Sequence, residues 1–124
     1  MRKRLVLLGA TGSIGASTLR VVAAHPDRFE VVGLAAGRDA KGLKALAERF
    51  GVRHLALAAP NDEGIPHGER ALCDLASLPE ADVVVMAIAG MAGYAPTLAA
   101  IEAGHDVALA TKEVLVMAGT EAVS

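Results

Sequence analysis

The sequence has 124 residues, which fits one domain that is long enough to bury a core. It is 53% hydrophobic but only 2% aromatic, so its core must be aliphatic, as in a parallel sheet buried beneath helices. The formal net charge is −2, and the basic residues are scattered apart from the cluster Arg2–Arg4. This charge distribution and the low aromatic content argue against a nucleic-acid partner.

The cysteine content and the N-terminus indicate the compartment. The single cysteine, Cys73, excludes an intramolecular disulfide and is expected to be a structural thiol in a reducing setting. The first apolar run is too short for a signal peptide, and no window approaches the roughly 20 apolar residues that a membrane-spanning helix needs. We therefore expect a soluble, cytoplasmic protein without a membrane partner.

A glycine-rich turn directly follows the first apolar run. The run Leu5–Leu8 lacks helical periodicity and leads at once into Gly9–Gly15, with the sequence GATGSIG. This pattern predicts a buried strand, a tight turn, and a helix that Ser13 caps and that begins at Ile14. Glycines let a pyrophosphate approach the backbone, and free N–H groups at a helix start attract anions. The turn therefore predicts a dinucleotide site, with a purely structural turn as the alternative.

The rest of the chain alternates strand-like and helical segments. Further strands are expected over residues 29–35, 54–58, 82–88 and 106–110. Helices are expected over 41–50, ended by Gly51, and from Pro96 in a first turn to residue 102. A short helix or irregular cover is expected over 69–78, and a last helix near Lys112 or Glu113. This alternation predicts βαβ units and a Rossmann-like, doubly wound parallel sheet.

The loop after the second strand bears on the choice of cofactor. It reads Gly37-Arg38-Asp39. The Arg38 guanidinium is a planar, permanently charged fork that suits the 2′-phosphate of NADP, whereas Asp39 is either the ribose-binding acid of an NAD site or the N-cap of the next helix. We favour Arg38 as a phosphate clamp and Asp39 as the cap. A solvated charge pair is the alternative.

Two later strand ends carry further candidates. Gly90–Gly93 can pass beneath a nicotinamide ribose or form a plain turn, and Thr111-Lys112-Glu113 can hold an anionic substrate and the nicotinamide or merely cap a helix. The four histidines lack metal-ligand spacing, and residues 61–63 form an acidic loop of the solvated kind. We expect no metal site and no complete catalytic set in this chain.

Four segments together resemble the N-terminal NADPH-binding domain of the 1-deoxy-D-xylulose 5-phosphate reductoisomerase family. They are Gly9–Leu19, Leu34–Asp39, Pro96–Ile101 and Leu109–Val116. The resemblance covers essentially all of residues 1–124 as one domain. The family makes 2-C-methyl-D-erythritol 4-phosphate by rearrangement and NADPH-dependent reduction, with a divalent metal (Mg or Mn), in non-mevalonate isoprenoid biosynthesis.

The resemblance also implies roles for individual residues. The pyrophosphate would be held by Thr11, Gly12, Ser13 and Ile14, and the 2′-phosphate and adenosine ribose would be surrounded by Gly37, Arg38 and Asp39. Lys112 would contact the phosphosugar substrate, Glu113 would contact the nicotinamide end, and Thr111 would also lie at the cofactor. Thr111 stands where the family usually has Asn, and a hydroxyl replaces only part of the bonding of an amide.

The resemblance implies a part of a longer enzyme. The family's metal-binding carboxylates, flexible loop and C-terminal domain lie beyond these 124 residues, so we expect cofactor binding without turnover and, from exposed apolar surface, a possible homodimer. One alternative is the cofactor domain of another NADP-dependent dehydrogenase, such as a semialdehyde or homoserine dehydrogenase, which residues 109–116 fit poorly. The other is a stand-alone nucleotide-binding or interaction domain, which would not need the nicotinamide.

Overall fold

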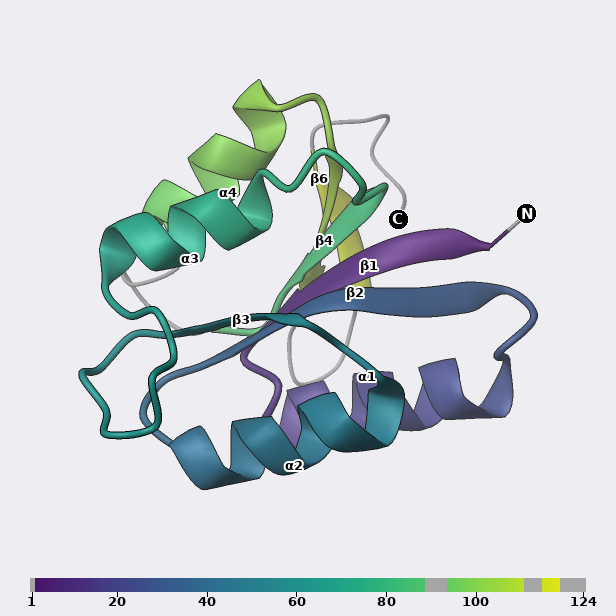
Figure 1. Ribbon diagram of the computed structural model, residues 1–124. Helices are drawn as coiled ribbons and strands as arrows, with labels where there is room; N and C mark the ends of the chain where they lie inside the picture. Colours follow the sequence, from purple (N-terminus) through teal and green to yellow (C-terminus); the bar gives the residue numbers. More distant parts are fainter. Residues whose placement is uncertain (1, 89–93, 111–114, 119–124) are drawn as a thin grey trace.

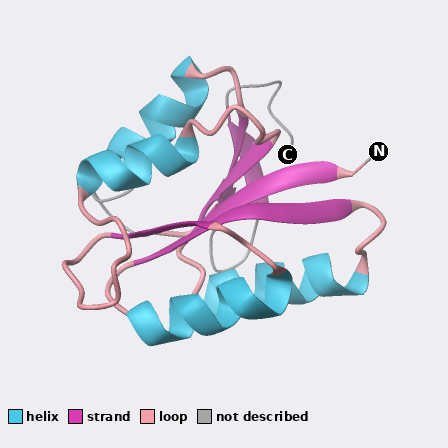
Figure 2. Ribbon diagram, viewed as in Figure 1, coloured by secondary structure: helices cyan, strands magenta, loops and turns pink. Residues whose placement is uncertain are grey.

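The computed structural model describes residues 2–88, 94–110 and 115–118. Within them, two pairs of helices lie against opposite faces of a single sheet, α1 with α2 and α3 with α4 (Figure 1; Figure 2 shows the same layers by element type). The elements in chain order are β1 (Lys3–Leu8), α1 (Ser13–Ala24), β2 (Phe29–Ala36), α2 (Ala40–Phe50), β3 (His54–Leu57), α3 (Glu69–Ala76), β4 (Val83–Met86), α4 (Tyr94–Glu102), β5 (Asp106–Ala110) and β6 (Leu115–Ala118).

The strand order is β3-β2-β1-β4-β5-β6, and the first five strands in this order run parallel to one another. The chain fills one half of the sheet from β1 outward to β3 and then returns to β4 on the other side of β1. Ligands of such sheets bind outside the carboxyl ends of the strands, at the point where the order reverses. The strand order and the parallel pairing confirm the predicted Rossmann-like fold class.

The last element differs from the prediction. The prediction of a helix starting near Lys112 or Glu113 is wrong, because Leu115–Ala118 forms β6, which pairs antiparallel with β5. A four-residue apolar run gives no periodicity that separates a strand from a buried helix. The open edge of β5 decides between them, because it offers the backbone of this run a row of hydrogen-bond partners.

Aliphatic side chains fill the space on both faces of the sheet. Alternate residues of β1 point to opposite sides: Leu5 and Leu7 join the core beneath α1 and α2, and Val6 and Leu8 join the core beneath α3 and α4. All four of these side chains are buried. Burial on both faces explains why the strands read as continuous aliphatic runs.

The outer edge of β3 is partly covered by the connection that follows it, residues 58–68. The Leu57 N–H donates to Pro66 O and the Gly68 N–H donates to Leu57 O, each at 2.9 Å. Asn61 holds this connection in shape, because its Nδ2 donates to Ile65 O and its Oδ1 accepts from two backbone N–H groups. Leu57 therefore has no free backbone group at the edge.

An ion pair ties the start of β4 to β1. The backbone N–H of Arg4 donates to Asp82 Oδ2 at 2.9 Å, and the Arg4 Nε lies 3.5 Å from the same oxygen. The hydrogen bond from the Arg4 backbone, helped by the Arg4 guanidinium, holds the pKa of Asp82 below its ordinary value of 3.8. This carboxylate therefore stabilises the fold at pH values above its unfolded pKa, and the contribution is lost as the pH falls through the folded pKa.

We predict that Asp82→Asn removes this acid-sensitive contribution. The amide oxygen keeps an acceptor for the Arg4 N–H but carries no charge, so the variant melts at a lower temperature than the wild type near neutral pH. The difference in Tm should shrink as the pH is lowered from about 6 to about 3, because the wild-type carboxylate becomes protonated. Thermal unfolding followed by circular dichroism measures it. A difference in Tm that stays constant over this range would contradict the assignment.

Candidate functional site

The glycine turn after β1 is fixed on the end of β2. The N–H groups of Gly9 and Ala10 both donate to Ala35 O at 2.8 Å, and Gly9 has a φ of +99°. A side chain at Gly9 would place its Cβ 2.7 Å from Ala87 O, and one at Gly15 would overlap the Gly9 carbonyl oxygen. The fold therefore requires glycine at these two positions, to let β1, β4 and α1 approach each other.

Two other glycines in this region are not required by the fold. Among the described residues, a Cβ built on Gly12 meets only Gly9 O, at 3.7 Å, and one built on Gly37 has nothing within 4 Å. Neither residue has a positive φ. The bare backbone at both positions borders open space at the carboxyl ends of β1 and β2, which fits a ligand that lies directly on the main chain.

Helix α1 begins without a side-chain cap. Its N-cap is Gly12, which has extended backbone (φ −83°, ψ 174°) and whose carbonyl accepts from the Ala16 N–H at 2.9 Å. The prediction that Ser13 caps this helix is wrong, because the helix starts one residue earlier and Ser13 is its first helical residue. The N–H groups of the first turn have no partner within the helix, so this end attracts an anion.

Helix α2, in contrast, has a conventional cap. Asp39 is its N-cap and accepts from the Gly42 N–H through Oδ1 at 2.9 Å. A side chain at position 42 would overlap the Asp39 carboxylate, so Gly42 leaves room for this bond. The helix ends at Gly51 in the left-handed conformation (φ +69°), as predicted. The predicted capping role of Asp39 is confirmed.

The Arg38 side chain lies between these two helix starts in the sequence. This side chain is exposed and makes no hydrogen bond or ion pair with any residue in the described ranges, while the Arg38 carbonyl accepts from the Ala40 N–H at 3.0 Å. Because Gly9 and Ala10 bond to Ala35, the uncapped start of α1 lies at the strand end next to the one that carries Arg38. The helix dipole and the Arg38 guanidinium thus both favour negative charge at this edge of the sheet.

The structure places seven of the predicted site residues at these adjoining strand ends. Thr11, Gly12 and Ser13 are exposed and Ile14 is half-buried at the start of α1, while Gly37, Arg38 and Asp39 are exposed after β2. Thr111, Lys112, Glu113 and the Gly90–Gly93 turn lie outside the described residues.

Other chemistry-bearing groups form no second centre in the described part of the chain. Among residues 2–88, 94–110 and 115–118, no three His, Cys, Asp or Glu side chains gather closely enough to hold a metal ion. Burial, followed by the charges of Glu69 and Asp74, raises the pKa of the Cys73 thiol, which makes it a poor nucleophile. Within the same ranges, no helix has the length and apolar character needed to cross a bilayer.

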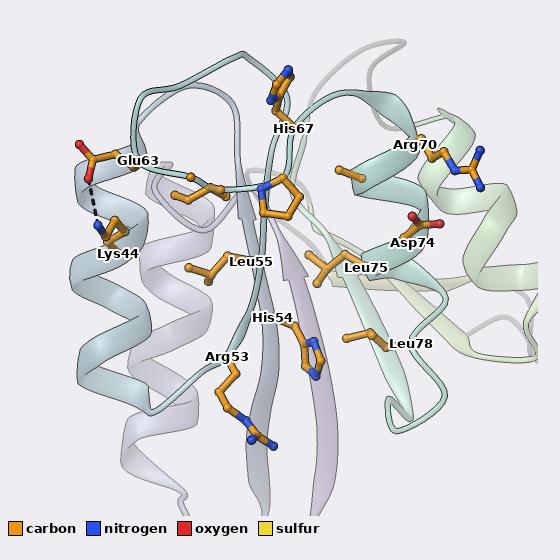
Figure 3. A pocket seen from close by; sticks show the side chains of 14 residues that line it. Lys44, Arg53, His54, Leu55, Glu63, His67, Arg70, Asp74, Leu75 and Leu78 are labelled. Atoms are coloured by element: carbon orange, nitrogen blue, oxygen red, sulfur yellow. Dashed lines mark hydrogen bonds and ion pairs between the residues drawn. The ribbon is translucent and has the colours of Figure 1, made fainter.

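A cavity of about 810 Å³ lies beside β3 and is lined by residues that do not include the glycine turn (Figure 3). Its apolar floor includes Leu55 and Leu75, and the ion pair between Lys44 and Glu63, at 2.9 Å, lies on one wall. The Lys44 ammonium holds the pKa of Glu63 below its ordinary value. None of the predicted site residues lines this cavity. Its residues come from β3, α2, α3, the connection 58–68 and the turns next to β3 and α3, without a shared motif that the sequence could have revealed.

Comparison with known proteins identifies relatives that share one enzyme name over most of this chain. Residues 5–119 match the family described as 1-deoxy-D-xylulose 5-phosphate reductoisomerase. The enzymes of that name from Geobacter metallireducens and Leifsonia xyli are 51% and 50% identical to this chain over 94% of its length. The chain spans only 34% and 30% of these two relatives, about a third of each.

Solved structures agree with the sequence match. The reductoisomerase from Zymomonas mobilis, solved with NADPH, superposes with a TM-score of 0.81 at 39% identity, covering 91% of this chain and 33% of that one. A reductoisomerase solved with NADPH, fosmidomycin and magnesium superposes with a TM-score of 0.78 at 36% identity, covering 85% of this chain and 29% of that one. The matched region takes in both the glycine turn and the Arg38 loop, and the chain belongs to the 1-deoxy-D-xylulose 5-phosphate reductoisomerase family.

Proposed function

We propose that residues 1–124 form the NADPH-binding domain of an enzyme that converts 1-deoxy-D-xylulose 5-phosphate to 2-C-methyl-D-erythritol 4-phosphate in non-mevalonate isoprenoid biosynthesis. The observation that carries the proposal is the uncapped start of α1 at the strand end next to Arg38, whose guanidinium has no partner among the described residues, with bare backbone at Gly12 and Gly37. Two phosphate-binding features at neighbouring strand ends match a dinucleotide that has a third phosphate on its ribose.

Each part of the cofactor has residues that would hold it. The N–H groups of Thr11–Ile14 would donate to the pyrophosphate, and Arg38 would form a bidentate contact with the 2′-phosphate above the open backbone of Gly37. NADPH supplies a hydride when bound. The Asp39 Oδ1 is engaged by the Gly42 N–H, so an NAD-type contact that uses both carboxylate oxygens for the ribose hydroxyls would cost α2 its cap.

The remaining assignments rest on the family resemblance. We propose that Thr111 and Glu113 contact the cofactor and that Lys112 contacts the phosphosugar substrate. A divalent metal would be held by the longer enzyme, as the relative solved with magnesium suggests. We also propose that the protein acts in the cytoplasm and that the 124-residue chain alone self-associates as a homodimer. Sedimentation that shows only monomer at high concentration would contradict the dimer.

Titration calorimetry of the chain with NADPH and with NADH tests the cofactor site. We expect tight binding of NADPH, weaker binding of NADH, and a loss of roughly 10- to 100-fold in NADPH affinity for Arg38→Ala, since a charge-assisted contact is worth about 1.5–3 kcal/mol. NADH affinity should be unchanged in this variant. The matched control is Arg49→Ala, which removes the same charge from the last turn of α2, and it should leave both affinities unchanged.

Other results would change the conclusion. Equal affinities for NADPH and NADH would favour an NAD-type site, and equal affinity for adenine nucleotides that lack the nicotinamide would favour a nucleotide-binding module that is not part of an oxidoreductase. The chain should bind NADPH without turning over the deoxyxylulose phosphate. Robust turnover by the 124 residues would contradict the proposal that the metal site and the rest of the catalytic apparatus lie elsewhere in the enzyme.

A further inference from the structure

Helix α4 is apolar on two opposite sides. Pro96 and Ala100 are buried, and Ala100 packs into the core beneath α3 and α4. Tyr94, Leu98 and Ile101 are 62%, 41% and 41% exposed, respectively. At the spacing of i, i+4 and i+7 these three side chains form one stripe, on the side of the helix roughly opposite to Pro96 and Ala100. We call these three residues the α4 stripe.

The outer side of α2 shows what a solvent-facing helix of this protein looks like. Its exposed positions include Lys41, Lys44, Glu48 and Arg49. In contrast, α4 contains a single charged residue, Glu102. A helix that is apolar all round is normally buried, and contiguous exposed apolar side chains mark a contact surface. The α4 stripe is therefore a surface that another structure should cover.

We propose that the α4 stripe is the contact surface for the polypeptide that full-length reductoisomerases carry beyond the region matched by this chain. The chain spans about a third of its curated relatives, so the relatives have a large polypeptide available as the occupant. This inference rests on family membership and does not depend on which nucleotide the domain binds.

The size of the stripe favours a covalently linked occupant. Interfaces between separate proteins bury about 800 Å² on each partner, far more than three side chains over two helical turns provide. A segment of the same polypeptide is held at an effective concentration in the millimolar range, so a small contact suffices to keep it docked. These three side chains alone are too small a surface to hold a second copy of the chain, so the homodimer proposed above would have to use other apolar surface.

The order of the elements brings the following polypeptide close to α4. Helix α4 ends at Glu102, directly before β5 begins at Asp106. Strand β6 runs antiparallel to β5, and its last residue, Ala118, pairs with Val107 near the start of β5. The end of β6 at Ala118 therefore lies at the end of the sheet where α4 finishes, and polypeptide joined there can return along the exposed side of α4.

Cysteine labelling tests the proposal. Leu98→Cys is made in the 124-residue chain and in a fusion in which this chain replaces the matched segment of the Geobacter metallireducens relative. The rate of maleimide labelling at position 98 is measured by mass spectrometry of the peptide that carries it. We expect labelling in the fusion to be at least about ten-fold slower than in the free chain, because protection requires opening of the contact. The matched control, Ala45→Cys on the exposed side of α2, should label at the same rate in both proteins.

Three results would overturn the proposal. The first is unchanged labelling of Leu98→Cys in a fusion that melts cooperatively, which would show that the stripe stays exposed. The second is protection that disappears when the fusion is diluted, which would assign the stripe to contact with a second copy. The third is failure to fold both of this fusion and of a second one made with the Leifsonia xyli relative, because the proposal requires these partners to fit α4.

Discussion

Gly15→Ala should strongly destabilise the fold. The added methyl group would overlap the Gly9 carbonyl oxygen and lie 2.8 Å from Ala10 O, and both atoms belong to a turn that is hydrogen-bonded to β2. Neither backbone group can move without breaking the contact between β1 and α1. We expect a cost above about 3 kcal/mol, a large part of the 5–15 kcal/mol by which domains are usually stable.

The same chemical change elsewhere serves as the control for Gly15→Ala. Gly37→Ala places its methyl group more than 4 Å from every described residue and requires no unusual φ, so its free energy of unfolding should be unchanged or raised by about 0.4–1 kcal/mol. Urea unfolding followed by circular dichroism compares the two variants. A Gly15→Ala protein as stable as the wild type would mean that the α1 start is not packed against the glycine turn as described.

Gly12→Ala should abolish tight NADPH binding while the fold survives. The new methyl group makes only an ordinary contact, 3.7 Å from Gly9 O, so the fold accepts it. It occupies the space through which the pyrophosphate would approach the first turn of α1, and we expect an affinity loss of at least about 100-fold, roughly 2.7 kcal/mol. Alanine is also a poorer N-cap than glycine, which should lower stability by up to about 1 kcal/mol.

A substitution at a second glycine serves as the control that separates the effect of Gly12→Ala on binding from its effect on stability. Gly51→Ala, at the left-handed end of α2, should also cost about 1 kcal/mol of stability, yet it should bind NADPH as tightly as the wild type. Calorimetric titration of both variants, each with its urea unfolding curve, makes the comparison. If Gly12→Ala bound NADPH as tightly as Gly51→Ala does, the glycine turn would be purely structural.

Much of the fold could be predicted because local chemistry and tertiary packing agree. Helix α2 is an example: the Asp39 cap, the apolar face that includes Leu43 and Ala47, and the glycine at position 51 all specify the same helix. The helix–strand alternation predicted the sheet in the same way. The expected segment over residues 69–78 is helical from Glu69 to Ala76.

The errors occurred where short sequences leave the decision to distant contacts. Ser13 is a favoured N-cap residue, yet the turn places Gly12 in the extended conformation with its carbonyl already accepting from Ala16, so the cap falls one residue earlier. The run Leu115–Ala118 was assigned to a helix because its four residues do not reveal that the edge of β5 is available to pair with them. In the candidate site, the sequence identified Gly12 and Gly37 by motif, but only the contacts around them distinguish these glycines from Gly9 and Gly15.

The covered edge of β3 has a consequence for how the isolated chain behaves in concentrated solution. Open edge strands template pairing with other molecules, and short or covered edges prevent it. Here the edge strand has only four residues, and Pro66–Gly68 already occupies both backbone groups of its last residue, Leu57. Too few free backbone groups remain on β3 for a second sheet to add there, so the molecule is protected at this edge from growth into fibrils.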